Sequence, residues 1–440
     1  MTRRDVDDVN RAQWSGRGNE SDARAGREGW RKPHCGQRRE RSATVQPRAG
    51  DHLSPVSSLL AIALGAPWVI TPIVTMIRAR HSRSLDDESA SAPAAAPLVS
   101  IVVPARNEAQ NIERCIRSAL AAEYPRLEVI AVNDHSTDET GAILRRLAAE
   151  DTRLRVVVPP PLPPGWFGKQ WACTVGAEAS SGDVIAFFDA DTRQAPDLIV
   201  RAVNGMRTRG ADLLTVAGSQ ELGSFWERMI QPQIFSIMLA RYGGTESVNE
   251  SRRASEKIAN GQCIFVKRQA YLETGGHGAV RGKVAEDLAM AQLYFTMGRR
   301  SFLVLGLTQL STRMYTSLRE IAEGWGKNIY AGGRESAPFG AFGRLIYPIL
   351  LVAPALSGLV PPILLALSLA GLVGHGVFIW AAIAGGANLI WWLVVYALLG
   401  LSPVYALLHP LGSAALLYIA LASIVRGKRV RWKERDYLAD

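Results

Sequence analysis

Two long stretches of the chain contain no charged side chain. Residues 53–77 and residues 345–425 include no Asp, Glu, Lys or Arg, although these residue types make up 20% of the 440 residues. Uncharged apolar segments of about 20 residues or more are typical of transmembrane helices, because the hydrocarbon core of a bilayer is about 30 Å thick. The longer stretch can hold about three helices, which we expect near residues 347–372, 377–400 and 403–425. The chain is therefore predicted to be an integral membrane protein.

Basic residues beside the predicted spans indicate an orientation. Residues 78–83 follow the first span and include three Arg, and the tail at 426–440 is also basic. Segments rich in Lys and Arg stay in the cytoplasm, so residues 78–344 and the tail are both predicted to be cytoplasmic in a multi-pass protein of the inner cell membrane. The three spans predicted within residues 345–425 would, however, place residues 78–344 and the tail on opposite sides of the membrane. One predicted span, either 347–372 or another, therefore does not cross, and the sequence leaves open which one.

Charge and cysteine patterns exclude several function classes. The net charge of +10 comes from basic residues near the membrane segments, where anionic head groups attract them. No basic helix with interleaved aromatic residues is present, so nucleic acid is not an expected partner. The four cysteines are widely separated and predict neither a disulfide framework nor a zinc site; they are Cys35, Cys115, Cys173 and Cys263. Residues 1–52 have few aliphatic side chains and are predicted to be a disordered charged tail, or an overextended start of the reading frame.

The segment between the predicted spans alternates strand and helix patterns. A helix capped by Asn107 is expected after the first strand, and a capping box at residues 136–139 is expected to open another after the second strand. Apolar runs rich in β-branched residues predict strands at 98–103, 127–132, 154–158 and 184–189. This order is typical of an α/β fold with a mainly parallel sheet flanked by helices. Transmembrane helices are expected at both ends of this domain.

Polar motifs follow three of the predicted strands. Pro104–Glu108, Asn133–Ser136 and Asp189–Asp191 should lie together, because ligands of such sheets bind outside the carboxyl ends of the strands. No G-x-G-x-x-G or G-x-x-x-x-G-K-[ST] motif is present, which argues against a nicotinamide dehydrogenase or a P-loop NTPase. The two aspartates of D-A-D point to the same side of an extended chain and suit Mg²⁺ or Mn²⁺, ions that often bridge to substrate phosphates. An isolated D-x-D can equally be a turn or a helix cap.

Taken in order, these motifs resemble the family-2 inverting glycosyltransferases with a GT-A fold. The resemblance rests on V-S-I-V-V-P-A-R-N-E at 99–108, V-N-D-H-S-T-D at 132–138 and D-A-D at 189–191, and it covers residues 98–335. The segment P-G-W-F-G-K-Q-W-A at 164–172 further resembles the subgroup that glycosylates membrane lipids, including hopanoid-associated and carotenoid-acid glycosyltransferases. The resemblance implies a GT-A-type mainly parallel sheet.

The resemblance also implies roles for individual residues. Asp134 would contact the nucleobase, and Lys169 would face the diphosphate. Asp189 and Asp191 would hold Mg²⁺ or Mn²⁺. Glu108 can also be explained as a first-turn helix carboxylate, and Lys169 as a solvated loop lysine. The implied residues for binding the nucleotide-sugar are Pro104, Arg106, Glu108, Asp134, Lys169 and Asp189.

In this family the catalytic base is expected about 100 residues after the metal motif, in an E-D pair. Glu286-Asp287 fits that position. Inversion in one step needs a carboxylate to accept the proton of the acceptor hydroxyl. Asp287 is the predicted base and Glu286 the second choice, although both could simply be carboxylates at a helix N-terminus. His277 and Arg281 precede the pair and could position the acceptor or a phosphate, or lie in a surface loop.

The sequence departs from the processive members of the family. Their Q-x-x-R-W motif is absent, and Glu323–Asn328 with Trp325 stands in its place. The resemblance therefore implies transfer of a single sugar from a nucleotide-diphosphate sugar to a membrane lipid acceptor at the cytoplasmic face. A processive polysaccharide synthase and a non-catalytic membrane scaffold that binds nucleotide-sugar are the alternatives. Residues 315–335 are expected to be either an amphipathic interfacial element or ordinary core.

Overall fold

The computed structural model describes residues 55–440, apart from residues 336, 338, 428, 433–434 and 439–440. The tail predicted at residues 1–52 lies outside the described residues.

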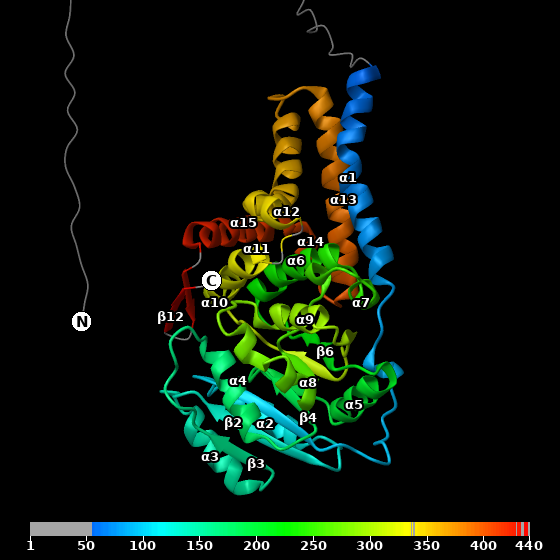
Figure 1. Cartoon of the computed structure of the whole chain (residues 1–440). Helices are drawn as coiled ribbons and strands as arrows, with labels where there is room; N and C mark the ends of the chain where they lie inside the picture. The colour runs from blue at the N-terminus through cyan, green and yellow to red at the C-terminus, as the bar shows by residue number, and fades with distance from the viewer. Residues whose placement is uncertain (1–54, 336, 338, 428, 433–434, 439–440) are drawn as a thin grey trace, which may run out of the picture. The chain divides into compact units, whose positions relative to one another are not determined.

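The described part of the chain contains four helices that are long and apolar enough to cross a membrane. Three of them pack side by side, with α13 in contact with both α1 and α12 (Figure 1). The fourth, α15, packs on α12 and also on the domain that precedes it. These helices are α1 (Pro55–Ala79), α12 (Gly340–Leu369), α13 (His375–Leu398) and α15 (His409–Arg426), with the short α14 (Val404–Leu407) before the last.

A seven-stranded sheet forms the centre of the α/β domain, which we define as residues 98–335. Its strand order is β3-β2-β1-β4-β8-β6-β9, and every neighbouring pair is parallel except those that involve β8. The mainly parallel sheet and its first four strands confirm the predictions. The strands are β1 (Val99–Ala105), β2 (Leu127–Asn133), β3 (Leu154–Val157), β4 (Val184–Phe188), β6 (Leu213–Ala217), β8 (Cys263–Lys267) and β9 (Ser301–Leu305).

Helices cover both faces of this sheet because its strands are apolar on both sides. Ile101 of β1 belongs to a core on one face, and its neighbour Val102 belongs to a core on the other. The first face carries α2 (Ile112–Leu120), α3 (Thr140–Glu150) and α5 (Leu198–Arg209); the second carries α4 (Gly168–Ala179), α8 (Arg268–Glu273) and α9 (Glu286–Thr296). Such continuous burial is typical of parallel strands covered by helices.

Smaller elements complete the described chain. Three short strands form a second sheet, and the tail forms a two-stranded hairpin. The remaining strands are β5 (Thr192–Gln194), β7 (Ser219–Gln220), β10 (Leu310–Thr312), β11 (Arg429–Trp432) and β12 (Arg435–Leu438). The remaining helices are η1 (Leu85–Asp87), α6 (Phe225–Tyr242), α7 (Thr245–Asn249), η2 (Ala254–Glu256), η3 (Gly276–Val280), α10 (Leu318–Lys327), η4 (Asn328–Gly332) and α11 (Gly333–Glu335).

Two predicted helix starts are wrong. α2 begins at Ile112 with Asn111 as its N-cap, so Asn107 does not cap it. α3 begins at Thr140, and no side-chain cap of the predicted capping box forms at its start. The reason is that the polar side chains of both segments bond across to the neighbouring loop at the edge of the sheet.

A third apolar core lies between the α/β domain and the long apolar helices. It joins α6 and α10 to α12 and α15, and its fully buried members include Ile230, Ile321 and Ile419. Tyr315 and Trp325 are also buried there. Of the element predicted at residues 315–335, Tyr315, Ile321 and Trp325 therefore pack as core.

Candidate active site

The three sequence motifs meet at one edge of the sheet, as predicted. β1 and β2 pair in parallel up to Ala105 opposite Asn133, and β1 pairs in parallel with β4. The carboxyl ends of these strands therefore share an edge, and the loop after each strand carries one motif. The backbone N–H of Asp134 donates to the carbonyl of Ala105 at 2.8 Å, which joins two of the loops directly.

Side chains of the first motif hold the second motif in place. Arg106 donates from Nη1 to the carbonyl oxygens of Asp134 at 2.8 Å and His135 at 3.0 Å. Asn107 Oδ1 accepts from the backbone N–H of Thr137 at 2.8 Å. Asn107 and His135 both adopt left-handed backbone conformations, with φ of 52° and 51°. Such conformations cost about 1 kcal/mol or more outside glycine and occur where the surroundings enforce them. Arg106 and Asn107 thus build the edge on which a nucleotide would rest.

Asp134 makes a contact that sequence reasoning missed. Its carboxylate is buried and accepts two hydrogen bonds from Arg435 of the tail hairpin, at 2.6 Å from Nη1 and 3.2 Å from Nη2. Paired donation from one guanidinium to both oxygens is the strongest geometry for such an ion pair. The two residues are 301 positions apart, and the basic tail carried no local signal for this contact.

Asp189 is held by its backbone as well as by its side chain. Its carbonyl oxygen accepts from Thr192 Oγ1 at 2.7 Å and from Cys115 Sγ at 3.5 Å. Its Oδ1 lies 2.7 Å from the Nζ of Lys169. Both ends of the residue are therefore fixed, and the following Asp191 is placed at the same edge.

Lys169 links the metal motif to the predicted catalytic pair. It lies in the first turn of α4, and its Nζ is 2.8 Å from Glu286 Oε1 as well as 2.7 Å from Asp189 Oδ1. Burial disfavours its charge, but Asp189 and Glu286 outweigh burial and raise the pKa of Lys169 well above its ordinary value. The ammonium therefore stays charged, and at 30% side-chain exposure it is still open to a ligand. The prediction that it faces a diphosphate is compatible with this position.

Asp287 lies beside this ion pair at the start of α9. Its Oδ2 accepts from the backbone N–H of Gly261 at 2.9 Å, and its Oδ1 accepts from that of Leu288 at 2.8 Å. Burial, followed by the charge of Glu286, raises the pKa of Asp287 to about 6. A carboxylate with a raised pKa is a stronger proton acceptor than an ordinary one. The structure thus brings the predicted base to the predicted metal motif.

The loop before β8 is a second feature that sequence reasoning missed. β8 runs antiparallel to β4, with Cys263 opposite Phe188, so the start of β8 lies beside the end of β4. A Cβ atom at Gly261 would lie 2.9 Å from Asp287 Oδ2 and 3.2 Å from Lys169 Nζ, closer than normal packing allows. A single glycine with no surrounding motif gave no signal of this role.

Lys327, the last residue of α10, brings a second positive charge to the cluster. Burial lowers its pKa to about 8, and its charge interacts with Glu286, Lys169 and Asp189. In the cluster of charges around Lys169, these two ammonium groups therefore accompany five carboxylates, and these seven groups alone carry an excess of three negative charges when all are ionised. The carboxylates are those of Glu108, Asp189, Asp191, Glu286 and Asp287.

Asp191 has the properties expected of a carboxylate that binds a cation. Its Oδ1 is buried and has no hydrogen-bond partner among the described residues. Burial, and then the charges of Asp189 and Glu108, raise the pKa of Asp191 to about 8. No group of three or more His, Cys, Asp or Glu in the described part of the chain is arranged to hold a metal ion alone. Two carboxylates nevertheless suffice for Mg²⁺, which usually takes its other ligands from water and substrate phosphates.

Comparison with known proteins identifies the domain. Residues 100–275 match the description of Glycosyl transferase family 2. This part of the chain is a family 2 glycosyltransferase domain. The chain is 28% identical over 243 residues to the 4,4'-diaponeurosporenoate glycosyltransferase of Staphylococcus aureus (strain MRSA252), with 54% of this chain and 63% of that protein covered. The chain thus spans just under two thirds of the length of this curated relative. The same enzyme of strain USA300 is 28% identical over 249 residues.

A solved structure supports the fold of the glycosyltransferase domain and its helical additions. The mannosyltransferase PcManGT from Pyrobaculum calidifontis, in complex with GDP-Man and Mn²⁺, superimposes with a TM-score of 0.50 at 19% identity. The match covers 84% of this chain and 98% of that chain. At this identity the similarity shows the shared GT-A-type fold.

His277 is part of the core of the glycosyltransferase domain. Its ring is 2% exposed, contacts the Phe187 ring at 4.6 Å between centroids, and shares a 2.9 Å hydrogen bond with the Tyr271 hydroxyl. Burial lowers its pKa to about 3, so the imidazole is neutral. The alternative that His277 lies in a surface loop is therefore wrong. Arg281 is exposed.

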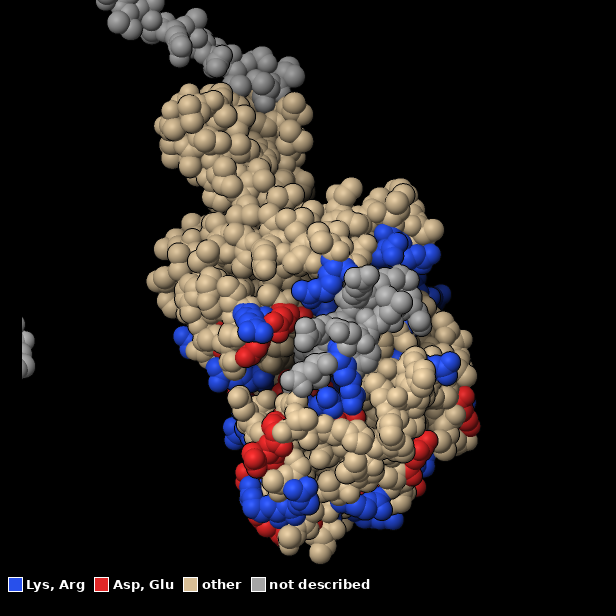
Figure 2. Space-filling model, turned by 90° about the vertical axis from the view of Figure 1, so that its left-hand side faces the viewer, with Lys and Arg blue, Asp and Glu red and all other residues tan. Residues whose placement is uncertain are grey.

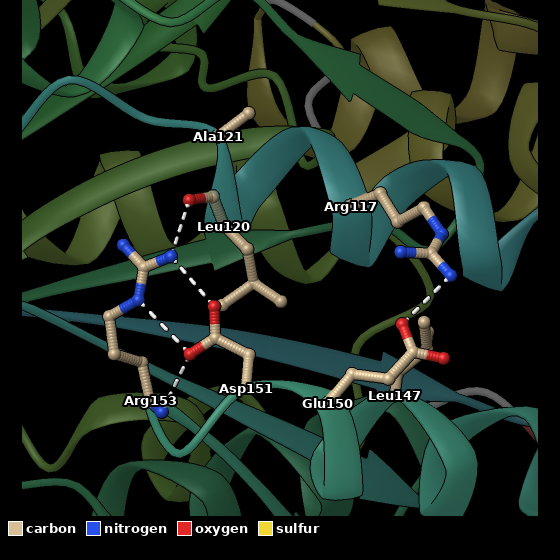
Figure 3. Close-up of a pocket in the computed structure, with 7 residues that line it drawn as sticks. All are labelled: Arg117, Leu120, Ala121, Leu147, Glu150, Asp151 and Arg153. Atoms are coloured by element: carbon tan, nitrogen blue, oxygen red, sulfur yellow. Dashed lines mark hydrogen bonds and ion pairs between the residues drawn. The ribbon is translucent and has the colours of Figure 1, made fainter.

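A surface hollow of about 340 Å³ lies away from this site (Figure 3). It is formed where α2 and α3 end, at the edge of the sheet opposite to the one where these helices begin. Arg117 pairs with Glu150 at 3.0 Å, and Arg153 pairs with Asp151 at 2.7 Å across it. Its polar groups bond one another, so the hollow provides only surface ion pairs.

Proposed function

We propose that the chain is a membrane-anchored inverting glycosyltransferase, which moves a single sugar from a nucleotide-diphosphate sugar to a membrane lipid acceptor at the cytoplasmic face. The observation that carries this proposal is the contact network in which Lys169 bridges Asp189 and Glu286 while Asp287 lies beside it. Membership of the domain in family 2 supports sugar transfer as the reaction type. The network contains a cation for the diphosphate (Lys169), a carboxylate for the metal (Asp189) and a proposed base (Asp287).

The donor would lie along the edge of the sheet. Asp134 would receive the N–H groups of the nucleobase, with Pro104, Arg106 and Glu108 beside the nucleotide. Lys169 would contact the diphosphate, where its permanent charge stabilises the negative charge that develops as the diphosphate leaves. The charge of Lys327, which interacts with Glu286 and Asp189, would reinforce the same effect.

Asp287 would accept the proton of the acceptor group while that group attacks the anomeric carbon. The Gly261 N–H and the Leu288 N–H fix its two oxygens, so the carboxylate is oriented before the acceptor arrives. Glu286 is occupied by Lys169 at 2.8 Å, which favours Asp287 over Glu286 as the base. A direct displacement of this kind inverts the configuration at the sugar.

Mg²⁺ or Mn²⁺ held by Asp189 and Asp191 would supply Lewis-acid stabilisation of the leaving diphosphate. The unpartnered oxygen of Asp191 and the excess negative charge of the cluster support this part of the proposal. PcManGT was solved with GDP-Man and Mn²⁺, and a divalent cation is proposed here by the same chemistry.

The acceptor is proposed to be a lipid because apolar helices flank the domain on both sides. The curated relative is named a 4,4'-diaponeurosporenoate glycosyltransferase. An acceptor of this kind would enter from the bilayer and present its hydroxyl or carboxylate to Asp287.

The proposal is tested with the full chain in lipid nanodiscs. A thermal-shift screen of nucleotide-sugars, with and without Mn²⁺, should identify one donor that stabilises the protein through native-state binding. With that donor labelled, the wild type should transfer one sugar to a lipid extract. Asp287→Asn should bind the donor and transfer nothing, while Glu150→Gln, a matched carboxylate change in the hollow of Figure 3, should behave as wild type.

The same assay separates the alternative functions. Products of many sugar units would identify a processive polysaccharide synthase. Donor binding with neither transfer nor metal-dependent hydrolysis would identify a non-catalytic scaffold. Full transfer by Asp287→Asn would refute the assignment of the base and leave the reaction type intact.

A further inference from the structure

α15 differs from the other apolar helices in how it contacts the glycosyltransferase domain. α1 reaches that domain at one end, where Arg78 donates to the carbonyls of Ala240 and Tyr242 at the end of α6. α12 begins beside the domain, with the Tyr347 hydroxyl donating to the Ile329 carbonyl at 2.8 Å. Each of these helices then leaves the domain, as a membrane span must (Figure 1).

Both ends of α15 contact the domain. At its start, the Gln233 side chain of α6 donates to the His409 carbonyl at 2.9 Å and accepts from Ser413 Oγ at 3.0 Å. At its end, Ser423 Oγ donates to the Gly326 carbonyl of α10 at 2.6 Å. The helix therefore runs along α6 and α10, and Figure 1 shows it lying crosswise below α12, against which it also packs.

The chain has already returned to the domain before α15 begins. Near the end of α13, the Tyr396 hydroxyl donates to the Arg228 carbonyl of α6 at 3.1 Å. The Tyr405 ring then packs on Phe225, with 5.9 Å between centroids. α12 and α13 thus form an antiparallel pair that leaves the domain and comes back, and α15 starts on the side where α12 started.

The outer face of α15 is apolar and exposed. Its inner face buries Leu416, Ile419 and Ser423, with exposures of 3% or less. Outward residues recur at intervals of three and four, which places them in one stripe along the helix. This stripe consists of Leu411, Ala414, Tyr418, Leu421 and Val425, and Val425 is 89% exposed.

We infer that α15 does not cross the membrane, and that it lies in the plane of the leaflet on the domain's side, with the stripe in the lipid. The stripe continues the exposed apolar surface of the neighbouring helices, and an apolar face on a helix lying flat is typical of interfacial binding. On the face shown in Figure 2 the charged side chains lie on the domain and at the base of the apolar helices, while the part of the helix bundle that projects from the domain carries none. The occupant of this face is therefore the bilayer.

This inference removes the conflict between the charge pattern and the number of spans. With α1, α12 and α13 as the spans, the domain and the tail lie on one side. The basic residues 78–83 and 426–431 then share the side that the rule for Lys and Arg assigns to the cytoplasm. The predicted span at 403–425 is the one that does not cross.

A depth measurement tests the inference directly and does not depend on the catalytic function. Single cysteines at Leu411, Tyr418 and Val425 in the full chain, with Cys35→Ser, are labelled with a bimane fluorophore; Cys115, Cys173 and Cys263 are buried. Lipids with a nitroxide at a shallow or a deep acyl position then quench the fluorophore. An in-plane helix gives three similar, shallow profiles. In a spanning helix, positions 411 and 425 would lie about 21 Å apart along the membrane normal. Strong quenching of position 418 by the deep nitroxide, with quenching of positions 411 and 425 by the shallow one, would therefore overturn the inference.

Sidedness provides a second readout. In sealed vesicles a membrane-impermeant maleimide should label Glu139→Cys on the domain and Asp440→Cys at the tail from the same side. Leu372 lies in the turn between α12 and α13 and is 71% exposed, so Leu372→Cys should be labelled from the opposite side. Labelling of Asp440→Cys together with Leu372→Cys would show that α15 crosses.

Discussion

The raised pKa of Asp287 predicts a loss of activity in mild acid. The base must be ionised to accept a proton, and burial together with the Glu286 charge raises its pKa to about 6, from a usual value of 3.8. The contribution of Asp287 to activity should therefore be nearly complete above pH 7 and fall as the pH drops through 6. With one group of pKa about 6, roughly one tenth of the carboxylates are ionised at pH 5, so the rate should fall about tenfold there. An ordinary aspartate would still be more than about nine-tenths ionised at pH 5.

The assay is kcat/KM for sugar transfer between pH 5 and 8 at saturating Mn²⁺, because this parameter reports groups of the free enzyme. Unfolding temperatures at each pH exclude acid denaturation as the cause. Glu286→Gln removes a charge that raises the pKa of Asp287, so its residual activity should show an inflection below that of the wild type. A flat wild-type profile down to pH 5 would refute the assignment of a buried base at this position.

Three further predictions follow from packing and charge. Gly261→Ala should lower kcat by about ten- to a hundred-fold without unfolding the protein, because its Cβ would displace the carboxylate of Asp287, the proposed base; steady-state kinetics check this. Gly176→Ala would place Cβ 2.3 Å from a valine of β1 and should destabilise the domain by about 1–3 kcal/mol, which is measured as a lower Tm. Gly386→Ala, whose Cβ would have no atom within 4 Å, should leave the Tm unchanged. Arg435→Gln should strengthen donor binding several-fold in calorimetry, because the nucleobase would no longer have to displace the Arg435 guanidinium from Asp134. Weaker binding would instead place Arg435 in the nucleobase pocket.

The sequence was most informative where structure is local. Buried apolar runs predicted the first four strands, and the parallel order placed Asp134 and Asp189 on one edge. Charge-free length predicted the apolar helices. The capping roles of Asn107 and Ser136 could not be predicted correctly, because both side chains bond across loops that only the folded sheet brings together.

The remaining features depend on contacts between distant parts of the chain. Gly261, Lys327 and Arg435 reach the site through an antiparallel strand, a helix end and a tail hairpin, and none carries a motif of its own. The orientation of α15 was hidden for a different reason. Its composition suits either a span or an interfacial helix, and only its bonds to Gln233 and Gly326 distinguish the two.

The antiparallel strand β8 has a consequence for how the site tolerates change. Its pairing with β4 fixes the loop before β8, so that the backbone N–H of Gly261 lies opposite Asp287. Because side chains alternate faces along a strand, a shift by one residue reverses which face each side chain occupies. A one-residue insertion between Gln262 and Cys263 could be absorbed by the loop with the sheet intact, yet it would move Gly261 away from Asp287 and put a side chain in its place. Catalysis is therefore more sensitive than folding to the length of this loop, and a library of single-residue insertions should show activity lost at residues 260–262 in proteins that still fold.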